Sequence, residues 1–312
     1  MRRFTVVVLT FITLLYPLTP VRPYTIQYTD STASTQIKWP SPAINIALST
    51  SLNTPPSNIK AGSDVEGAAR RALAQWAAVA NIQFNVTTST HQSVVEDGVS
   101  LITVADTSGF VTGGNPGKAR VYRQGGTITE ADIAINTNLQ FSTDGTAGTY
   151  DLESTFVHEI GHILGLEHSG VVGATMQPRQ GTNGTFDLPA DTVRTLAGDD
   201  VSGIRSIYGP LTGLGSISGT ISGPGGPVFG AHVWAEEVST GRVAAGNVTF
   251  QNGSYRIDGL SAGQYRVIVE PLDERALAAE IPARNGAYQG LQGVQPSFRT
   301  SESAGPVSVS AG

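Results

Sequence analysis

In the first part of the chain, hydrophobic residues recur with two different spacings, one typical of strands and one typical of helices. Residues 44–48 and 82–86 alternate apolar and polar positions, which predicts two strands that each bury one face. Between them, residues 64–80 carry apolar and small side chains at helical spacing, and Asp64 is suited to the N-cap of that helix. The pattern therefore predicts a strand, a helix and a second strand in this order.

The same reading extends to residue 208. Residues 118–123 and 128–136 predict two strands joined by a Gly-Gly turn. Residues 152–164 predict a helix that ends at Gly165, and residues 199–208 predict another helix that begins with two aspartates. A region of this kind mixes helices and strands around one core.

The composition shifts after residue 208. A Gly-Pro pair and a stretch rich in glycine and serine precede short alternating segments, which Asn-Gly and Asp-Gly turns separate. This pattern predicts a small all-β sandwich. We therefore expect a mixed domain at 24–210, a linker at 211–214 and an all-β domain at 215–312; the chain ends near a further expected strand, which leaves open whether that domain is truncated.

The N-terminus has the form of a signal peptide. Arg2 and Arg3 precede an uncharged segment at 4–16, and Pro17 interrupts it. A membrane anchor is the alternative, but the segment is short for a bilayer span of about 20 residues. We expect residues 1–23 to be a signal peptide, no membrane span, and a secreted, extracellular protein.

Charge and cysteine content exclude several classes of function. The net charge of −6, without a cluster of basic residues, argues against nucleic acid as a partner. The chain has no cysteine, so neither disulfides nor a cysteine nucleophile nor cysteine ligands to zinc are available. Stability must come from core packing and bound ions.

One segment carries the chemistry. His158 and His162 stand four residues apart on the predicted helix, so both imidazoles can reach one ion, and Glu159 lies beside the first of them. Gly165 can adopt a left-handed conformation and turn the chain, which brings His168 back toward the same ion. Three nitrogen ligands with a fourth position open are typical of a catalytic zinc site.

This spacing is more specific than two histidines on a helix. The chain has five histidines, and three of them fall within this segment. The other two, His91 and His232, are isolated, and we interpret both as ordinary surface or core residues.

The segment resembles the signature of metzincin peptidases. Ala174-Thr175-Met176-Gln177-Pro178 looks like the Met-turn of that clan, with Met176 beneath the metal. Within the clan, several features resemble the matrixin (matrix metalloproteinase) subgroup. They are Ser169 directly after the third histidine, Lys38-Trp39-Pro40, the helix around Trp76 and the segment at 199–209. The resemblance implies an α+β zincin fold, in which a twisted mixed sheet accompanies an active-site helix and a C-terminal helix. Residues from 215 onward resemble the carboxypeptidase regulatory-like (transthyretin-like) β-sandwich.

Two departures from the matrixin pattern stand out. Matrixins commonly hold a second, structural zinc ahead of the catalytic helix, but His91 is the only histidine between residue 24 and His158, so we expect that zinc to be missing. Matrixins are also kept latent by a cysteine, and this chain has none.

The resemblance implies a secreted endopeptidase that hydrolyses peptide bonds of extracellular proteins, with one catalytic Zn²⁺ and Glu159 as the general base. An extended substrate is expected to pair with the edge strand at 117–123, through Ala119, Arg120 and Val121, with its side-chain pocket at 170–187. Calcium (Ca²⁺) is a further candidate cofactor. Its ligands would come from carboxylates that could equally be solvated charges: Asp106, Asp132, Asp144, Asp151 and Glu153.

Two other functions stay open at this point. One is a metal-dependent hydrolase that acts on something other than peptides, and the other is a secreted binding protein with a vestigial metal site. The presence of Glu159 weighs against the second, because a protein that only binds has no use for a general base. We expect a monomer.

Overall fold

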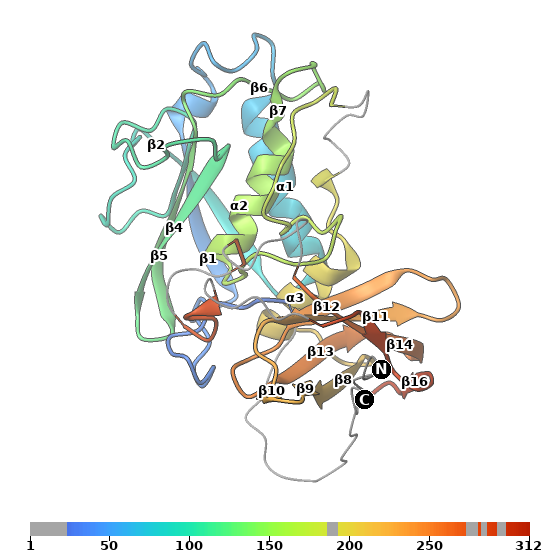
Figure 1. Cartoon of the computed structure of the whole chain (residues 1–312). Coiled ribbons are helices and arrows are strands. Elements are labelled where there is room, and N and C mark those ends of the chain that lie inside the picture. Colours follow the sequence, from blue (N-terminus) through green and yellow to red (C-terminus); the bar gives the residue numbers. More distant parts are fainter. Residues whose placement is uncertain (1–23, 186–192, 273–279, 282–285, 292–297) are drawn as a thin grey trace. The chain divides into compact units, whose positions relative to one another are not determined.

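The computed structural model describes residues 24–185, 193–272, 280–281, 286–291 and 298–312 (Figure 1). The predicted signal peptide lies outside these residues. The chain divides into two compact units, and each is described by itself. The first unit is Ile37–Gly165 with Arg179–Ala197, and the second is Met1–Gln36, Leu166–Pro178 and Gly198–Gly312. In the described part of the chain, no helix has the length and apolar character needed to span a membrane.

The first unit contains a mixed five-stranded sheet in the order β2-β1-β3-β5-β4. β1 pairs in parallel with β2 and β3, β3 pairs in parallel with β5, and β4 pairs antiparallel with β5. β4 therefore forms one edge of this sheet. The strands are β1 (Ala43–Ser49), β2 (Gln83–Ser89), β3 (Leu101–Thr103), β4 (Gly117–Gln124) and β5 (Thr127–Ile135).

Four of these strands lie where the sequence predicts them, and β3 was missed. All three residues of β3 are buried, so no alternation of apolar and polar residues marks it. The unit also contains a short 3₁₀ helix, η1 (Thr50–Leu52), and a small parallel pair, β6 (Phe141–Ser142) with β7 (Tyr150–Asp151).

Helices α1 (Val65–Val79) and α2 (Leu152–Ile163) lie side by side on one side of this sheet (Figure 1). Asp64 caps α1, because its side chain accepts a hydrogen bond from the Gly67 amide at 3.1 Å. α2 in turn packs against β4 and β5. The sheet and α1 thus give α2 a continuous apolar support, which is why α2 is almost entirely buried.

The second unit contains α3 (Gly198–Tyr208) and the C-terminal strands. One sheet has the order β12-β11-β14-β15, with β16 also paired to β14, and β13 pairs antiparallel with β8. Two short strands, β9 (Ser222–Gly223) and β10 (Gly226–Pro227), form an antiparallel pair. The longer strands are β8 (Gly215–Thr220), β11 (Ala231–Glu237), β12 (Val243–Val248), β13 (Ser254–Leu260) and β14 (Gly263–Pro271), and the last two are β15 (Ser301–Glu302) and β16 (Val307–Val309).

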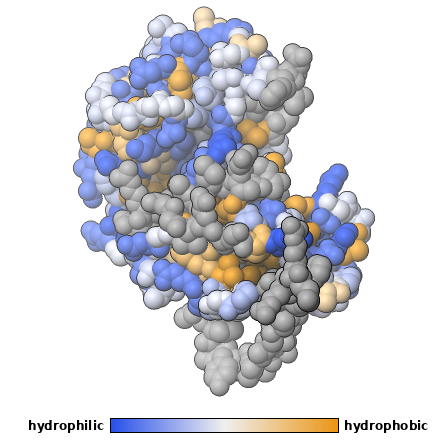
Figure 2. Space-filling model, in the orientation of Figure 1, coloured by the Kyte–Doolittle hydropathy of each residue, from blue (hydrophilic) through white to orange (hydrophobic). Residues whose placement is uncertain are grey.

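The alternating segments predicted after residue 208 are 232–235, 254–257 and 265–269, and they lie in β11, β13 and β14. β12 was not predicted, because Val-Ala-Ala-Gly-Asn-Val carries no alternation and its last four residues are all buried. Polar residues cover much of the face seen in Figure 2, among smaller hydrophobic patches. The predicted domain boundary at 210–215 stays a prediction.

Candidate metal centre

Hydrogen bonds and an ion pair fix the position of α2, the helix that carries two of the three histidines. Asp151 caps the helix by accepting from the Ser154 amide at 2.8 Å, and Arg194 pairs with the buried Asp151 carboxylate. Two tryptophan indoles donate to carbonyls of α2: Trp76 to Val157 at 2.9 Å, and Trp39 to Ile163 at 2.8 Å. These contacts fix the rotation of the helix, and with it the direction of its histidines.

His158 and His162 follow each other by one turn of α2. Their ring centroids lie 4.8 Å apart at nearly right angles, and their Nε2 atoms are 3.2 Å apart. The helix ends at Ile163, and Gly165 has φ +97°, a left-handed conformation that turns the chain away from the helix axis. The predicted role of Gly165 in the bend therefore agrees with its backbone.

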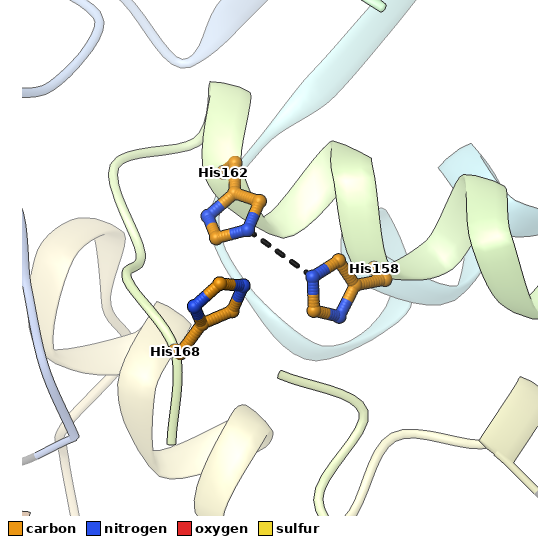
Figure 3. A group of neighbouring side chains, drawn as sticks. All are labelled: His158, His162 and His168. Atoms are coloured by element: carbon orange, nitrogen blue, oxygen red, sulfur yellow. Dashed lines mark hydrogen bonds between the residues drawn. The ribbon is translucent and has the colours of Figure 1, made fainter. Parts of the chain in front are cut away.

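The three histidines converge after this bend. One nitrogen from each of His158, His162 and His168 lies within 4.8 Å of the other two (Figure 3). The rings turn toward one another, two from α2 and the third from the segment that follows it. Among the described residues, this is the group of histidine or carboxylate side chains with the geometry to hold a metal ion.

This donor set fits zinc. Imidazole nitrogens on one tetrahedral zinc lie about 3.3 Å apart, given Zn–N bonds of about 2.05 Å. The His158–His162 separation matches that value. The Nδ1 atom of His168 lies against the Glu280 carbonyl oxygen, which can only accept, so Nδ1 carries the proton and Nε2 is the nitrogen that would bind metal. His158, His162 and His168 thus form a site suited to a zinc ion.

Glu159 lies beside these ligands without belonging to the group. Its side chain is buried, and burial raises its pKa to about 8, while the Ala119 backbone N–H and the charge of Lys118 act in the opposite direction. A Cβ atom at Gly117 would lie 2.9 Å from both Cγ and Oε1 of Glu159. Gly117 therefore lets the edge strand β4 pass directly over this carboxyl, a requirement that the sequence pattern did not reveal.

The predicted substrate residues lie on that edge strand. Ala119, Arg120 and Val121 pair with Ile133, Asp132 and Ala131 of β5, which leaves the other edge of β4 without a strand partner in the described sheet. The guanidinium of Arg120 lies 5.0 Å from the ring centroid of Phe110. Of the predicted pocket at 170–187, the last two residues lie outside those that the structure describes.

The turn around Met176 is held by the start of α3. Asp200 accepts hydrogen bonds from the amides of Thr175, at 2.8 Å, and Met176, at 3.0 Å. The Ser169 amide donates to the Met176 carbonyl at 2.8 Å, and the Met176 side chain is buried. Two aspartates at the start of a helix are favourable beside its positive end, and the sequence predicted no more than that for Asp199 and Asp200. The role of Asp200 in holding the turn was not predicted.

The five carboxylates considered for calcium all have protein partners. Asp144 pairs with Lys60, Glu153 with Arg71, and Asp151 with Arg194. Asp106 accepts from the amides of Ser108 and Phe110, and Asp132 accepts from the Leu101 amide. These contacts account for their positions in the fold, and calcium stays a prediction.

Comparison with known proteins agrees with this geometry. The matrixin family model matches residues 38–209. Metalloendoproteinase 1 of Glycine max is 34% identical over 146 residues, which cover 46% of this chain and 45% of that protein. Metalloendoproteinase 4-MMP of Arabidopsis thaliana is 31% identical over 155 residues, 48% of this chain and 41% of that protein.

A third relative is the interstitial collagenase of Oryctolagus cuniculus, 27% identical over 147 residues, which are 47% of this chain and 29% of the collagenase. The chain thus spans less than half the length of these curated relatives. The match to the family model covers more than half of this chain and includes the three histidines and Glu159. The chain therefore belongs to the matrixin family.

Proposed function

We propose that this protein is a secreted zinc-dependent endopeptidase that hydrolyses peptide bonds of extracellular proteins. The observation that carries the proposal is the convergence of three imidazoles beside a buried glutamate at the edge of a sheet. Relatives named metalloendoproteinase and interstitial collagenase support a peptide as the substrate. The uncharged segment at 4–16 supports secretion.

The roles of the residues follow from their positions. His158, His162 and His168 would hold the zinc, and the ion would supply Lewis acidity that activates a water molecule and polarises the scissile carbonyl. The charge of a bound zinc would favour the ionised form of Glu159, against the burial that raises its pKa. The Glu159 carboxylate would then accept the proton of the attacking water and later deliver it to the nitrogen of the leaving amine. Met176 lies in the buried turn that supports the segment of the third histidine.

The substrate is proposed to lie extended along β4. An edge strand presents free backbone donors and acceptors, and an added peptide strand satisfies them. This ladder would form along Ala119, Arg120 and Val121. Because the Ala119 N–H faces Glu159, one end of the ladder would lie beside the general base. A peptide bound in this way would bring a scissile carbonyl to the glutamate.

The C-terminal strands are proposed to form a separate β-sandwich of the carboxypeptidase regulatory-like type, at 215–312, after a catalytic domain at 24–210. One hydrophobic cluster supports this, because it combines side chains from the β8–β13 pair with side chains from the larger sheet. Its members include Ile217, Ile257, Val233, Ala245 and Val267.

Replacing the general base tests the proposed function. The purified full chain, loaded with zinc, is expected to cleave casein or quenched peptides, and a chelator should stop the cleavage. Glu159→Ala should lower kcat/KM by about 10²- to 10⁴-fold, because general acid–base catalysis contributes that much. Its zinc content should stay at that of the wild type, since Glu159 is not one of the ligands.

The control for this experiment is Glu66→Ala, which removes a half-buried glutamate of α1 that pairs with the exposed Arg70. Equal cleavage by wild type and Glu159→Ala would refute the assigned base. Cleavage of small esters or amides but of no peptide would favour the non-peptide hydrolase. Zinc binding without any hydrolysis would favour the binding protein.

A further inference from the structure

The segment that carries the third histidine is held by residues from far along the chain. We call Leu166–Pro178 the ligand loop and residues 215–312 the C-terminal module. The Nδ1 atom of His168 donates to the carbonyl of Glu280 in the module. The next residue, Ser169, donates from Oγ to Oδ2 of Asp199 at 2.6 Å. The ligand loop and the module thus belong to one compact unit of the structure.

Asp199 connects the ligand loop to the module. Its side chain is 2% exposed, and its two oxygens have different partners. Oδ2 accepts from Ser169, and Oδ1 accepts from the amide of Gly246 in β12 at 2.7 Å. One buried carboxyl group therefore joins the residue after the third histidine to a strand of the module through two hydrogen bonds.

Two glycines show how closely the loop and the module pack. A Cβ atom at Gly170 would lie 3.0 Å from Cδ2 of His232 in β11. A Cβ atom at Gly246 would lie 2.9 Å from Cγ2 of Val171 in the loop. Neither glycine has a positive φ, so close packing, and not backbone conformation, explains the lack of a side chain at both positions.

We propose that the C-terminal module positions the third zinc ligand, and that Asp199 is the positioning residue through which it acts. A histidine on a loop binds metal tightly only when the loop is already ordered, and partners of ligand residues typically change metal affinity by about 10- to 100-fold. Asp199 and β12 supply that order to the loop of His168. The module is therefore part of the metal centre and not a spacer.

This inference rests on the proposed zinc site, and full-length variants test it. Asp199→Ala removes both hydrogen bonds and should weaken zinc binding by about 10-fold or more, measured by competition with a chromophoric chelator. The visible spectrum of the cobalt-substituted protein should also change, because the geometry of its ligands is altered. Asp199→Asn keeps an oxygen for Gly246 and an amide for Ser169, so it should restore most of the affinity.

Ser202→Ala is the matched control. Ser202 is also buried in α3, and it donates to the Asp258 carbonyl of the module, a contact that does not involve the ligand loop. If the contact acts by positioning the loop, this variant should bind zinc and give a cobalt spectrum as the wild type does. Equal weakening by Ser202→Ala and Asp199→Ala would overturn the inference in favour of general packing.

A second pair of variants decides the question if Asp199→Ala does not fold. Gly246→Ala should push β12 against Val171 and weaken zinc binding, whereas Gly225→Ala, which has nothing within 4 Å of the new Cβ, should not. Wild-type zinc affinity in folded Asp199→Ala, or in Gly246→Ala, would refute the inference and leave the proposed function intact. Failure of the wild type to bind stoichiometric zinc would refute the proposed function instead.

Discussion

The metal centre has two parts that are built by different means. The helix part consists of His158, Glu159 and His162 on α2, and the loop part consists of the ligand loop with His168 and Met176. In the helix part, one regular element sets the spacing of every functional side chain. In the loop part, hydrogen bonds to two aspartates of α3 hold the chain in place, and one of these aspartates also accepts from β12. The helix part is therefore readable from local sequence, whereas the loop part depends on distant residues.

Breaking the anchor of the helix part should have the largest effect on stability. Arg194→Ala leaves the carboxylate of Asp151 buried without its cation, and loss of one partner of a buried pair costs about 3 kcal/mol or more. Chemical denaturation should show this loss as a lower midpoint. Arg70→Ala, which removes a pair on the exposed face of α1, should cost less than about 1 kcal/mol. A similar cost for both variants would contradict the anchoring role.

Two buried carboxyl groups should make the free energy of unfolding depend on pH, one in the sheet beside α2 and one beside the ligand loop. Burial raises the pKa of Asp132 in β5 to about 7, with the charges of Glu130 and Asp97 adding to it, and burial beside Asp200 raises the pKa of Asp199 to about 7. A carboxyl with a folded pKa above its unfolded value binds more protons when folded. Its contribution is therefore full below about pH 4 and is lost as the pH rises through about 7.

Asp132→Asn should remove the contribution of Asp132 to this loss of stability with rising pH. Asp132 lies in β5, in the sheet that packs against α2. The asparagine oxygen can still accept from the Leu101 amide, so the fold should be kept. The free energy of unfolding, measured by urea titration from pH 4 to pH 8, should fall less steeply than in the wild type. A residual slope from Asp199 and Glu159, whose pKa values burial also raises, should remain. An unchanged slope would show that Asp132 is ionised in the folded protein at neutral pH.

The junction between the two parts should give the smallest effect. Gly165→Ala places a side chain at φ +97°, which costs about 1–2 kcal/mol because left-handed backbone is unfavourable for alanine. Thermal unfolding should detect this cost, and zinc binding should weaken because the bend delivers His168. Gly114→Ala is the control, since Gly114 lacks a positive φ and has open space around it. Wild-type stability in Gly165→Ala would show that the bend tolerates a side chain.

The local sequence predicted most of the first unit because its elements carry clear periods. Asp64 marked the start of α1, Gly165 marked the bend after α2, and alternation located β1, β2, β4 and β5. β3 and β12 escaped because strands buried on both faces show no alternation. Their positions follow from pairing with strands that are distant in the sequence.

By itself, the sequence determined the choice and spacing of the proposed zinc ligands, because helical geometry fixes His158 and His162 and a glycine permits the turn to His168. Only the tertiary structure decided that Gly117 lets β4 approach Glu159, and that Asp199 joins Ser169 to β12. The physical reason is that periodicity reports which face of an element is buried. The partner that covers a buried group is chosen by packing between segments far apart in the chain.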